Sequence, residues 1–278
     1  MPKITPIAAF NDNYIWLLEA HGQAVCIDPG DAAPVLAYLH AHNLALSQIW
    51  ITHHHADHTG GVAALKAAYP DCTVYGNRDI AEADAAAAEG TRIRFGDLQA
   101  EVWATPGHTD SHLSYLLTLS DGLHVFCGDT LFSAGCGRVF TGTIAQLFAS
   151  FQRYKRLPAN TLFYPAHEYT AANLRFAAHI EPDNADIQTA LQQAARTPTL
   201  PVSLAHERKV NPFLRSAEPD VAARAAALSD DVLPDEAAVF AALRELKNRF
   251  WAGLKILSAY RLIGAIPILK NNIQTGSP

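Results

Sequence analysis

The sequence predicts an α/β domain followed by a smaller, mainly helical domain. Strand-like and helix-like segments alternate over the first 170 residues, which is typical of sheets covered by helices. After about residue 170 the strand signals fade, and helical spacing of apolar residues takes over. Several expected strands of the first part end in histidine or aspartate, which places polar side chains along a sheet edge. We therefore expect domains at residues 1–170 and 171–278.

The first part begins with two expected strands, residues 4–10 and 13–20, joined by an Asn-Asp turn. Further strands are expected at residues 24–28, 48–52, 73–76, 101–105, 113–119, 124–129 and 161–167. Helices are expected at residues 33–43, 60–69, 143–157, 168–180, 184–197, 220–229 and 234–254. This order gives a sheet-rich half that leads into a helical one.

The composition is that of a folded protein with an ample core, since hydrophobic residues make up 49% of the 278 residues and charged residues 17%. The net charge of -6 disfavours a nucleic-acid partner. We expect no secretory signal and no membrane span, because no uncharged apolar run approaches the roughly 20 residues that a span needs. We expect a cytoplasmic protein whose cysteines are buried or free thiols, namely Cys26, Cys72, Cys127 and Cys136.

The segment "THHHADHTGG", residues 52–61, crowds four histidines and an aspartate behind an expected strand. In an extended segment His53 and His55 point to the same side, and the following turn brings Asp57 and His58 beside them. Neutral imidazole and carboxylate are ligands that zinc, iron and manganese accept. The HxHxDH pattern therefore predicts a metal site.

Three later segments repeat the arrangement of a strand that ends in a possible ligand, and they contribute His108, Asp129 and His167. Ligands at strand ends along one sheet edge form a concave polar site. Five histidines and two aspartates suffice for two metal ions bridged by one carboxylate. We expect His112 to support the site from outside the ligand set, and His54 to have either that role or a structural one. The remaining histidines are expected at the surface or in packing roles: His21, His40, His42, His124, His179 and His206.

Six segments of the chain form a recognisable set: "THHHADHTGG", "TPGHTDSH", "FCGDTLFSAGCGRVFTGT", "YPAHEYTAANLRFA", "IEPDN" and "NPFLR". This set resembles the glyoxalase II (hydroxyacylglutathione hydrolase) family of the metallo-β-lactamase superfamily. The resemblance runs from about residue 4 to about residue 250. It implies an αββα sandwich of two mixed sheets with metals at one edge, and a smaller helical domain that contributes to a glutathione site.

The resemblance also implies a role for each site residue. The first metal ion would be held by His53, His55 and His108, and the second by Asp57, His58 and His167. Asp129 would bridge them together with a water or hydroxide, which Asp57 would also orient. The implied contacts to glutathione are Arg138, Phe140, Tyr169, Arg244 and Lys247. Phe140 stands where many relatives have tyrosine, so one hydroxyl contact would be missing.

Arg244 and Lys247 carry a second argument from their spacing. An i, i+3 pair lies on one helix face, which suits two cations that grip one carboxylate. On spacing alone the same pair would more often be ordinary solvated charges. The resemblance, not the spacing, favours the binding role.

The implied reaction is hydrolysis of S-D-lactoylglutathione, and of related S-2-hydroxyacylglutathiones, to D-lactate and glutathione by hydroxide held between two divalent metal ions. Zinc is the expected metal, and the same ligands accept iron or manganese. Three alternatives stay open: a persulfide dioxygenase of the same fold with one iron, a two-metal phosphodiesterase or nuclease, and a non-catalytic metal-binding protein. The complete second ligand set argues against the first alternative, and the acidic balance argues against the second.

After Phe250 the chain departs from the family, whose members end within a few residues. The extension from about residue 251 is apolar, with scattered Lys255, Arg261 and Lys270. We expect it to pack on the helical domain, because exposed apolar area is normally avoided; an oligomer surface and a membrane surface are the alternatives. We expect a monomer whose partner is a small glutathione thioester.

Overall fold

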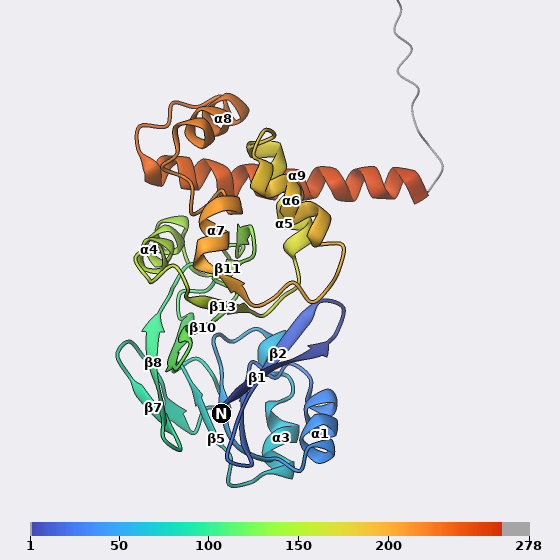
Figure 1. Cartoon of the computed structure of the whole chain (residues 1–278), viewed down its shortest axis with the longest axis vertical. Helices are drawn as coiled ribbons and strands as arrows, with labels where there is room; N and C mark the ends of the chain where they lie inside the picture. The colour runs from blue at the N-terminus through green and yellow to red at the C-terminus, as the bar shows by residue number, and fades with distance from the viewer. Residues whose placement is uncertain (1, 263–278) are drawn as a thin grey trace, which may run out of the picture.

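Two six-stranded sheets form the centre of the protein in the computed structural model, which describes residues 2–262 (Figure 1). The first sheet has the strand order β1 (Lys3–Ala9), β2 (Asn13–Ala20), β3 (Gln23–Ile27), β4 (Ala45–Trp50), β5 (Thr73–Gly76) and β6 (Ala85–Ala86). Its strands are antiparallel from β1 to β3 and parallel from β3 to β6. The sheet is therefore mixed, as expected.

The second sheet has the order β14 (Val202–Ser203), β13 (Leu162–Pro165), β10 (Gly122–Gly128), β9 (Leu113–Leu119), β8 (Leu98–Ala104) and β7 (Arg92–Phe95). Its neighbours are antiparallel except β10 and β13, which run parallel. A separate two-stranded hairpin consists of β11 (Leu131–Phe132) and β12 (Gly135–Cys136). This hairpin follows β10 directly and lies beside the site described below.

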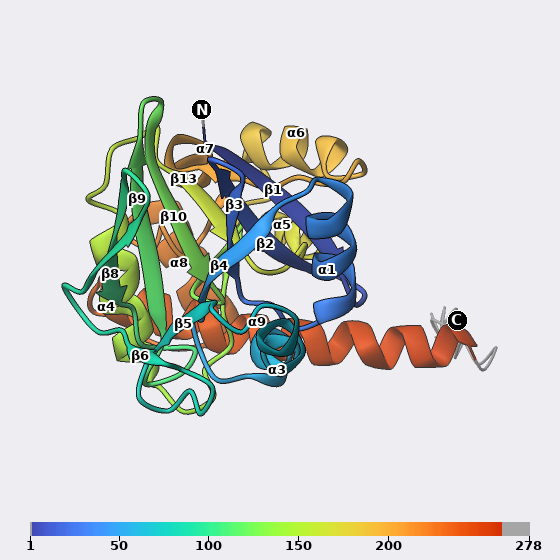
Figure 2. The ribbon, with the colours of Figure 1, turned by 90° about the horizontal axis from the view of Figure 1, so that it is seen from below.

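Helices cover the outer faces of the two sheets, as Figure 2 shows. On the first sheet lie α1 (Ala32–Ala41) and α3 (Val62–Ala68), and α4 (Ile144–Tyr154) lies on the second. A single-turn helix, α2 (Ala56–Thr59), precedes α3. The four layers confirm the αββα arrangement.

Strand β2 shows how alternation builds the two cores. Trp16 and Leu18 belong to the large apolar cluster between the sheets, whereas Ile15 and Leu17 belong to the cluster under α1 and α3. All four side chains are buried. Successive side chains of a strand point to opposite faces, so a strand with helices on one side and a sheet on the other must be apolar throughout.

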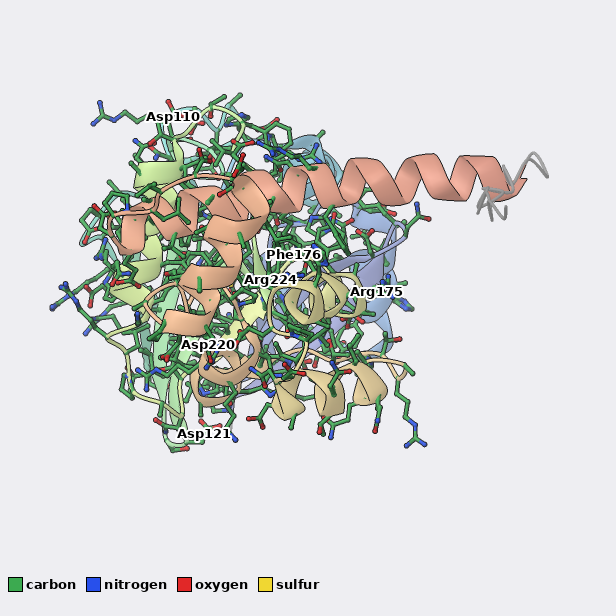
Figure 3. The ribbon with its side chains drawn as sticks, turned by 90° about the horizontal axis from the view of Figure 1, so that it is seen from above. Asp110, Asp121, Arg175, Phe176, Asp220 and Arg224 are labelled. Carbon is green, nitrogen blue, oxygen red and sulfur yellow. The ribbon has the colours of Figure 1, made fainter. Side chains whose placement is uncertain are left out.

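The C-terminal part is mainly helical, with α5 (Thr170–Ile180), α6 (Ala185–Gln193), α7 (Leu204–Val210), α8 (Pro219–Ser229) and α9 (Glu236–Leu262). Helix α9 passes over α5, with Phe176 on the side of α5 that α9 covers and Arg175 on the outer side (Figure 3). The rings of Phe176 and Phe250 lie 5.6 Å apart and join the two helices.

The expected strands and helices are present, and several short elements were missed. These are the strands β6, β7 and β14, the hairpin β11–β12, and the helices α2 and α7. Strand β14 extends the second sheet by pairing with β13, so a short strand does occur after residue 170. All four cysteines are buried and free, as expected. Within residues 2–262 the structure has no helix that could cross a membrane. The expected packing of the extension after Phe250 lies outside the described side chains.

Candidate metal centre and adjoining pocket

The segment after β4 delivers the first four candidate ligands. His55 has extended backbone angles (φ -65, ψ 145) and caps α2, whose single turn carries Asp57 and His58. The loop after β3 packs closely on this turn, because a Cβ on Gly61 would lie 2.6 Å from the carbonyl oxygen of Pro29. The glycine pair at 60–61 therefore lets α3 begin directly beside the ligands, as the sequence indicated.

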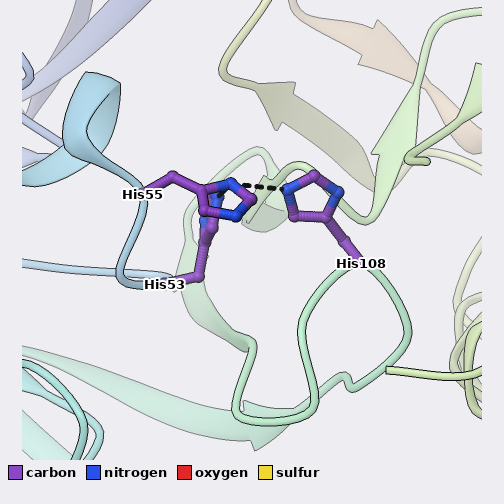
Figure 4. Close-up of side chains that lie close together, drawn as sticks. All are labelled: His53, His55 and His108. Carbon is purple, nitrogen blue, oxygen red and sulfur yellow. Dashed lines mark hydrogen bonds between the residues drawn. The ribbon is translucent and has the colours of Figure 1, made fainter. Parts of the chain in front are cut away.

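Three imidazoles converge in the first cluster, which Figure 4 shows. Nδ1 of His55 lies 3.0 Å from Nε2 of His53 and 3.1 Å from Nε2 of His108. His53 and His108 are buried, and His55 is partly exposed. Three ring nitrogens this close together suit one metal ion, since each can offer its lone pair to the same point.

The second cluster joins Asp57 and His58 to His167, which follows β13. Oδ2 of Asp57 lies 3.4 Å from Nε2 of His167 and 3.6 Å from Nε2 of His58. His58 and His167 are buried, whereas Asp57 is partly exposed. One carboxylate and two imidazoles again form a donor set for a divalent metal ion.

Asp129 lies between the two clusters. Its Oδ1 is 3.5 Å from Nε2 of both His58 and His167, and its Oδ2 is 3.5 Å from Nε2 of His108. Gly128 brings it there with a φ of +46, and a Cβ at that position would lie 2.4 Å from Oγ1 of Thr52. Asp129 thus touches both clusters with different oxygens, as a bridging carboxylate would.

The donor set fits two divalent cations on a further observation. Nε2 of His58 and Oδ1 of Asp129 are buried without a hydrogen-bond partner among the described residues. Buried polar atoms are nearly always satisfied, and the rare orphans indicate an ion or a water. The clusters at 53, 55 and 108 and at 57, 58 and 167, with Asp129 between them, provide the sites for such ions.

Outer partners lie beside three ligand rings, and two of these rings, those of His108 and His167, form hydrogen bonds with them. Nδ1 of His108 donates to the carbonyl oxygen of Arg138 at 2.7 Å, which leaves Nε2 as the lone-pair atom. Nδ1 of His167 faces Asp12 at 2.9 Å, and Nδ1 of His58 faces Asp28 at 3.0 Å. Such partners set the tautomer and the direction of a metal-binding imidazole.

His112 and His54 behave differently from each other. Nε2 of His112 accepts from the backbone N–H of Asp129 at 3.2 Å, so His112 supports the bridging residue as expected. Nδ1 of His54 lies 2.8 Å from Oδ2 of Asp79, and the ring is partly exposed outside both clusters. His54 therefore braces the loop rather than the ligand rings.

Burial and neighbouring charges shift the ligands in different directions: although burial opposes it, Asp129 raises the pKa of His58 and His167, so these two rings must release a proton to bind a cation. Burial, together with the imidazoles nearby, holds the pKa of His53 well below its usual range, so its ring is neutral. Burial opposes ionisation of Asp129, yet the imidazoles of His167 and His58 hold its pKa well below the usual range. Neutral imidazole and ionised carboxylate are the forms that coordinate cations.

A cavity of about 680 Å³ opens beside the clusters, and all five expected substrate contacts line it: Arg138, Phe140, Tyr169, Arg244 and Lys247. The ring of Tyr169 stacks on His167 at 4.7 Å, and the ring of Phe140 meets His55 edge-on at 5.1 Å. Phe140 is 58% exposed at this wall. Aromatic rings thus flank the ligands where a substrate would enter.

Arg244 and Lys247 are buried, with 3% and 2% of their surfaces exposed. The interpretation of this pair as solvated charges is therefore wrong. Arg244 donates to the carbonyl oxygens of Cys136 and Gly137, each at 3.1 Å. Nζ of Lys247 donates to Oδ1 of Asn173 at 2.6 Å, and burial lowers its pKa to about 7. Two cations on one helix face, buried at a cavity wall, favour an anionic ligand.

Two family models match the chain in succession. The model of the metallo-beta-lactamase superfamily matches residues 9–167, and that of the hydroxyacylglutathione hydrolase C-terminus matches residues 168–250. A hydroxyacylglutathione hydrolase of Neisseria meningitidis is 65% identical over 248 residues, which cover 89% of this chain and 99% of the relative. The chain belongs to the hydroxyacylglutathione hydrolase family. A family member from Xanthomonas axonopodis is 45% identical, with 90% of this chain and 100% of the relative covered.

Solved structures bear out the fold of this hydroxyacylglutathione hydrolase family member. ETHE1 from Myxococcus xanthus is similar with a TM-score of 0.59 and 28% identity, and the match covers 89% of this chain and 98% of that one. A protein solved in a di-iron-bound form has a TM-score of 0.57 and 26% identity, and the match covers 76% of this chain and all of the other. The fold that the resemblance implied is confirmed.

Sequence reasoning missed the outer partners of this family member. Asp28 follows β3 in "CIDPG", and its side chain accepts from the backbone N–H and the hydroxyl of Thr52, both at 2.7 Å, besides facing His58. Asp12, which faces His167, was assigned only to a turn. Its neighbour Asn13 donates from Nδ2 to Oδ2 of Asp57 at 3.2 Å. Asp28 ends an expected strand, as the ligands do, and this signal could have marked it as a candidate; its role as a partner of His58 follows only from β3 lying beside β4.

Proposed function

We propose that the protein hydrolyses S-D-lactoylglutathione and related S-2-hydroxyacylglutathiones to a 2-hydroxy acid and glutathione. The single observation that carries this proposal is the joining of a two-cluster metal site to a cavity with two buried cations, Arg244 and Lys247. A glutathione thioester needs both parts of this site: the metal clusters for its thioester carbonyl and the two cations for its anionic glutathione part. Membership of the hydroxyacylglutathione hydrolase family supports the same reaction.

Two zinc ions are the proposed cofactors, and the same ligands accept iron or manganese. His53, His55 and His108 would hold the first ion, Asp57, His58 and His167 the second, and Asp129 both. When bound, the ions lower the pKa of a water to about 7 and stabilise negative charge on the thioester carbonyl oxygen. The thiolate leaves readily, so the chain does not need a strong general acid.

The chain's own residues would bind and orient the substrate. Arg244 and Lys247 would attract the glycine carboxylate of glutathione, and the exposed Arg138 would add a third positive charge at the rim. Tyr169 would contact the peptide part, and Phe140 would offer only its ring, without a hydroxyl. Asp57 would orient the attacking water, because its side chain is 43% exposed and Asp129, the other carboxylate ligand, is only 9% exposed. These contacts mainly lower KM, whereas the ligands determine kcat.

A persulfide dioxygenase of the same fold is the second candidate. Such an enzyme would need one iron with open positions for oxygen. The presence of a second donor set, with orphaned atoms on His58 and Asp129, favours the hydrolase. Oxygen consumption with glutathione persulfide would separate the two reactions.

The broader setting follows from the same proposal. We infer a cytoplasmic enzyme, because glutathione is the proposed partner and the cysteines are free, and we propose that it acts as a monomer. Residues 1–170 would form the catalytic domain, and the helices after residue 170 would complete the glutathione site through Arg244 and Lys247. The boundary would fall beside Tyr169, at the start of α5.

The test is steady-state hydrolysis of S-D-lactoylglutathione, followed as loss of thioester absorbance on protein of known metal content. We expect turnover with about two metal ions per chain. His55→Gln should abolish it, whereas His54→Gln should leave most of it, because His54 lies outside both clusters. A fully metallated protein that leaves the thioester intact would refute the substrate assignment.

A further inference from the structure

The hairpin β11–β12 connects Asp129 of the candidate metal centre to Arg138 of the pocket along the chain. It begins two residues after Asp129 and ends two residues before Arg138. Every residue from 131 to 137 is buried. Two residue pairs hold its strands together, Leu131 with Cys136 and Phe132 with Gly135. A hairpin with only two residue pairs is marginally stable by itself, and contacts with surrounding groups must therefore hold it in place.

Glu207 of α7 is the group that fixes the turn of this hairpin. Its side chain is fully buried and accepts three hydrogen bonds: from Oγ of Ser133 at 2.9 Å, from the backbone N–H of Ala134 at 2.8 Å, and from Nδ2 of Asn211 at 2.9 Å. Ala134 has a φ of +54, which is unusual for a residue with a Cβ. Such a conformation persists where the surroundings determine it, and here the Glu207 carboxylate binds its amide.

Charge does not explain why a carboxylate occupies this place. Among the described residues, Glu207 takes part in no ion pair with a lysine, arginine or histidine. Burial raises the pKa of Glu207 to about 7, so its ionised form is costly here. The hairpin needs a side chain long enough to place two oxygens at the turn, because each oxygen accepts a hydrogen bond there.

The other side of the same turn meets the pocket. Nδ2 of Asn173 donates to the carbonyl oxygen of Ser133 at 2.9 Å, and Oδ1 of Asn173 accepts from Lys247. A Cβ on Gly135 would lie 2.6 Å from Nδ2 of Asn173, so the hairpin backbone presses against this side chain. A shift of the turn would therefore move Asn173 and, through it, the ammonium group of Lys247.

Arg244 depends on the second strand of the hairpin. Its guanidinium donates to the carbonyl oxygens of Cys136 and Gly137, and the Sγ of Cys136 lies 3.3 Å away. Asn211 donates to the carbonyl oxygens of Phe132 and Gly135, which ties the strand back to Glu207. Both cations of the pocket are thus positioned by the hairpin that Glu207 fixes.

We propose that Glu207 is a positioning residue for substrate affinity: by fixing the β11–β12 turn from behind, it places Lys247 and Arg244 for the anionic end of a glutathione thioester. The inference rests on the proposed function. It assigns Glu207 no contact with substrate or metal, because Glu207 is not among the residues that line the cavity, whereas Asn173 is. Changes that shorten the Glu207 side chain should therefore raise KM and leave kcat and metal content in place.

Two variants separate shape from charge. Glu207→Gln keeps the length of the side chain and loses the charge, and its amide can donate to Ser133 while its oxygen accepts from Ala134. Glu207→Asp keeps the charge but is shorter by one methylene, so it cannot reach both partners. We expect KM for S-D-lactoylglutathione to rise about tenfold in Glu207→Asp and to change less than about twofold in Glu207→Gln. Values of kcat and metal content should match the parent protein in both.

Three results would overturn the inference. An unchanged KM in Glu207→Asp would show that the turn does not position the pocket. A raised KM in Glu207→Gln alone would show that charge matters rather than reach. A fall in kcat and metal content at constant KM would show that the hairpin serves Asp129 instead.

Two further measurements keep the test decisive. If Glu207→Asp does not fold, Ser133→Ala removes a single hydrogen bond from the same turn and should still raise KM, by about threefold. If the parent protein does not hydrolyse the thioester, the proposed function fails. Binding of S-methylglutathione, a thioether that cannot be hydrolysed, then still decides the inference: weaker binding in Glu207→Asp supports it, and equal binding refutes it.

Discussion

Nδ1 of His167 lies 2.9 Å from Oδ1 of Asp12, although the two residues are 155 positions apart in the chain. This contact turns the other ring nitrogen, Nε2, toward Asp57 and Asp129, at 3.4 and 3.5 Å. A turn at the edge of the first sheet thereby orients a ligand that follows β13 of the second sheet. The metal centre depends on the sandwich as a whole, because each sheet supplies ligands and one supplies the partner of the other's ligand.

Removal of the Asp12 carboxylate should weaken the second metal site. In Asp12→Ala the ring of His167 loses the acceptor that fixes its tautomer, and outer partners of this kind change metal affinity about 10- to 100-fold. We expect metal content to fall toward one ion per chain after dialysis against a weak chelator, with kcat falling in parallel. Metal analysis and turnover on the same samples provide the measurement.

A matched control exists in the pair His21 and Asp97, whose side chains lie 3.2 Å apart and are 73% and 75% exposed. Asp97→Ala removes the same kind of carboxylate–imidazole contact at residues that belong to neither ligand cluster and do not line the cavity. It should change neither metal content nor kcat. Equal metal content in Asp12→Ala and Asp97→Ala would contradict the orienting role of Asp12.

Lys247 should make ligand binding depend on pH near neutrality. Burial, with Arg244 beside it, lowers the pKa of Lys247 to about 7, so the free protein loses this positive charge as the pH rises through 7. An anionic ligand prefers the charged form. We expect the affinity for S-methylglutathione to fall between pH 6 and pH 8.5, as titration calorimetry would measure.

Lys247→Arg is the control for this dependence. An arginine stays charged throughout that range, so its affinity should be nearly constant with pH even if the absolute value is lower. A slope that persists unchanged in Lys247→Arg would show that another group titrates. A flat profile in the parent protein would show that Lys247 keeps its proton.

The candidate metal ligands could be identified from the sequence because their signals are local. The HxHxDH pattern lies within six residues, and His108, Asp129 and His167 each follow an apolar run that reads as a strand. Strand ends of neighbouring sheets meet at one edge, so the ligands could be grouped without coordinates. The resemblance then divided them between two ions.

The supporting groups could not be predicted, because their roles depend on packing. Asp28 becomes a partner of His58 only once β3 is known to lie beside β4. Glu207 sits on α7, a seven-residue helix too short for a periodic signal, and it binds a hairpin whose strands have two residues each. The spacing of Arg244 and Lys247 placed both on one helix face but could not show that the face is buried.

Glu207→Gln should stabilise the protein at alkaline pH. Burial raises the pKa of Glu207 from 4.5 to about 7, so the folded protein holds a proton there that the unfolded chain has already lost. The free energy of unfolding therefore falls as the pH rises from 4.5 to about 7, and stays lower above that. The difference corresponds to about 3 kcal/mol, which the neutral amide avoids.

The measurement is thermal or urea unfolding of both proteins at pH 4.5 and pH 8. We expect the variant to be more stable at pH 8 and the two to be nearly equal at pH 4.5, where the glutamate is protonated when folded. The pKa of Lys247 is lowered from 10.5 to about 7, so Lys247 makes stability rise with pH above 7; this effect is the same in both proteins and cancels when they are compared at one pH. If Glu207→Gln were no more stable than the parent protein at pH 8, ionisation of Glu207 would not lower the free energy of unfolding.

Chelation of the metals should destabilise the protein as well as inactivate it. The buried Oδ1 of Asp129 and Nε2 of His58 have no hydrogen-bond partner among the described residues, so a bound cation satisfies atoms that the folded chain otherwise leaves unpaired. A ligand present at a thousand times its Kd stabilises a fold by about 4 kcal/mol. After chelation we expect a lower Tm and no thioester hydrolysis, and we expect the original Tm and the activity to return when zinc is restored.

Asp129→Asn, which removes the charge between the clusters, should show the low Tm even with zinc present. Hydrolysis that survives complete chelation would exclude metal-assisted chemistry at this site.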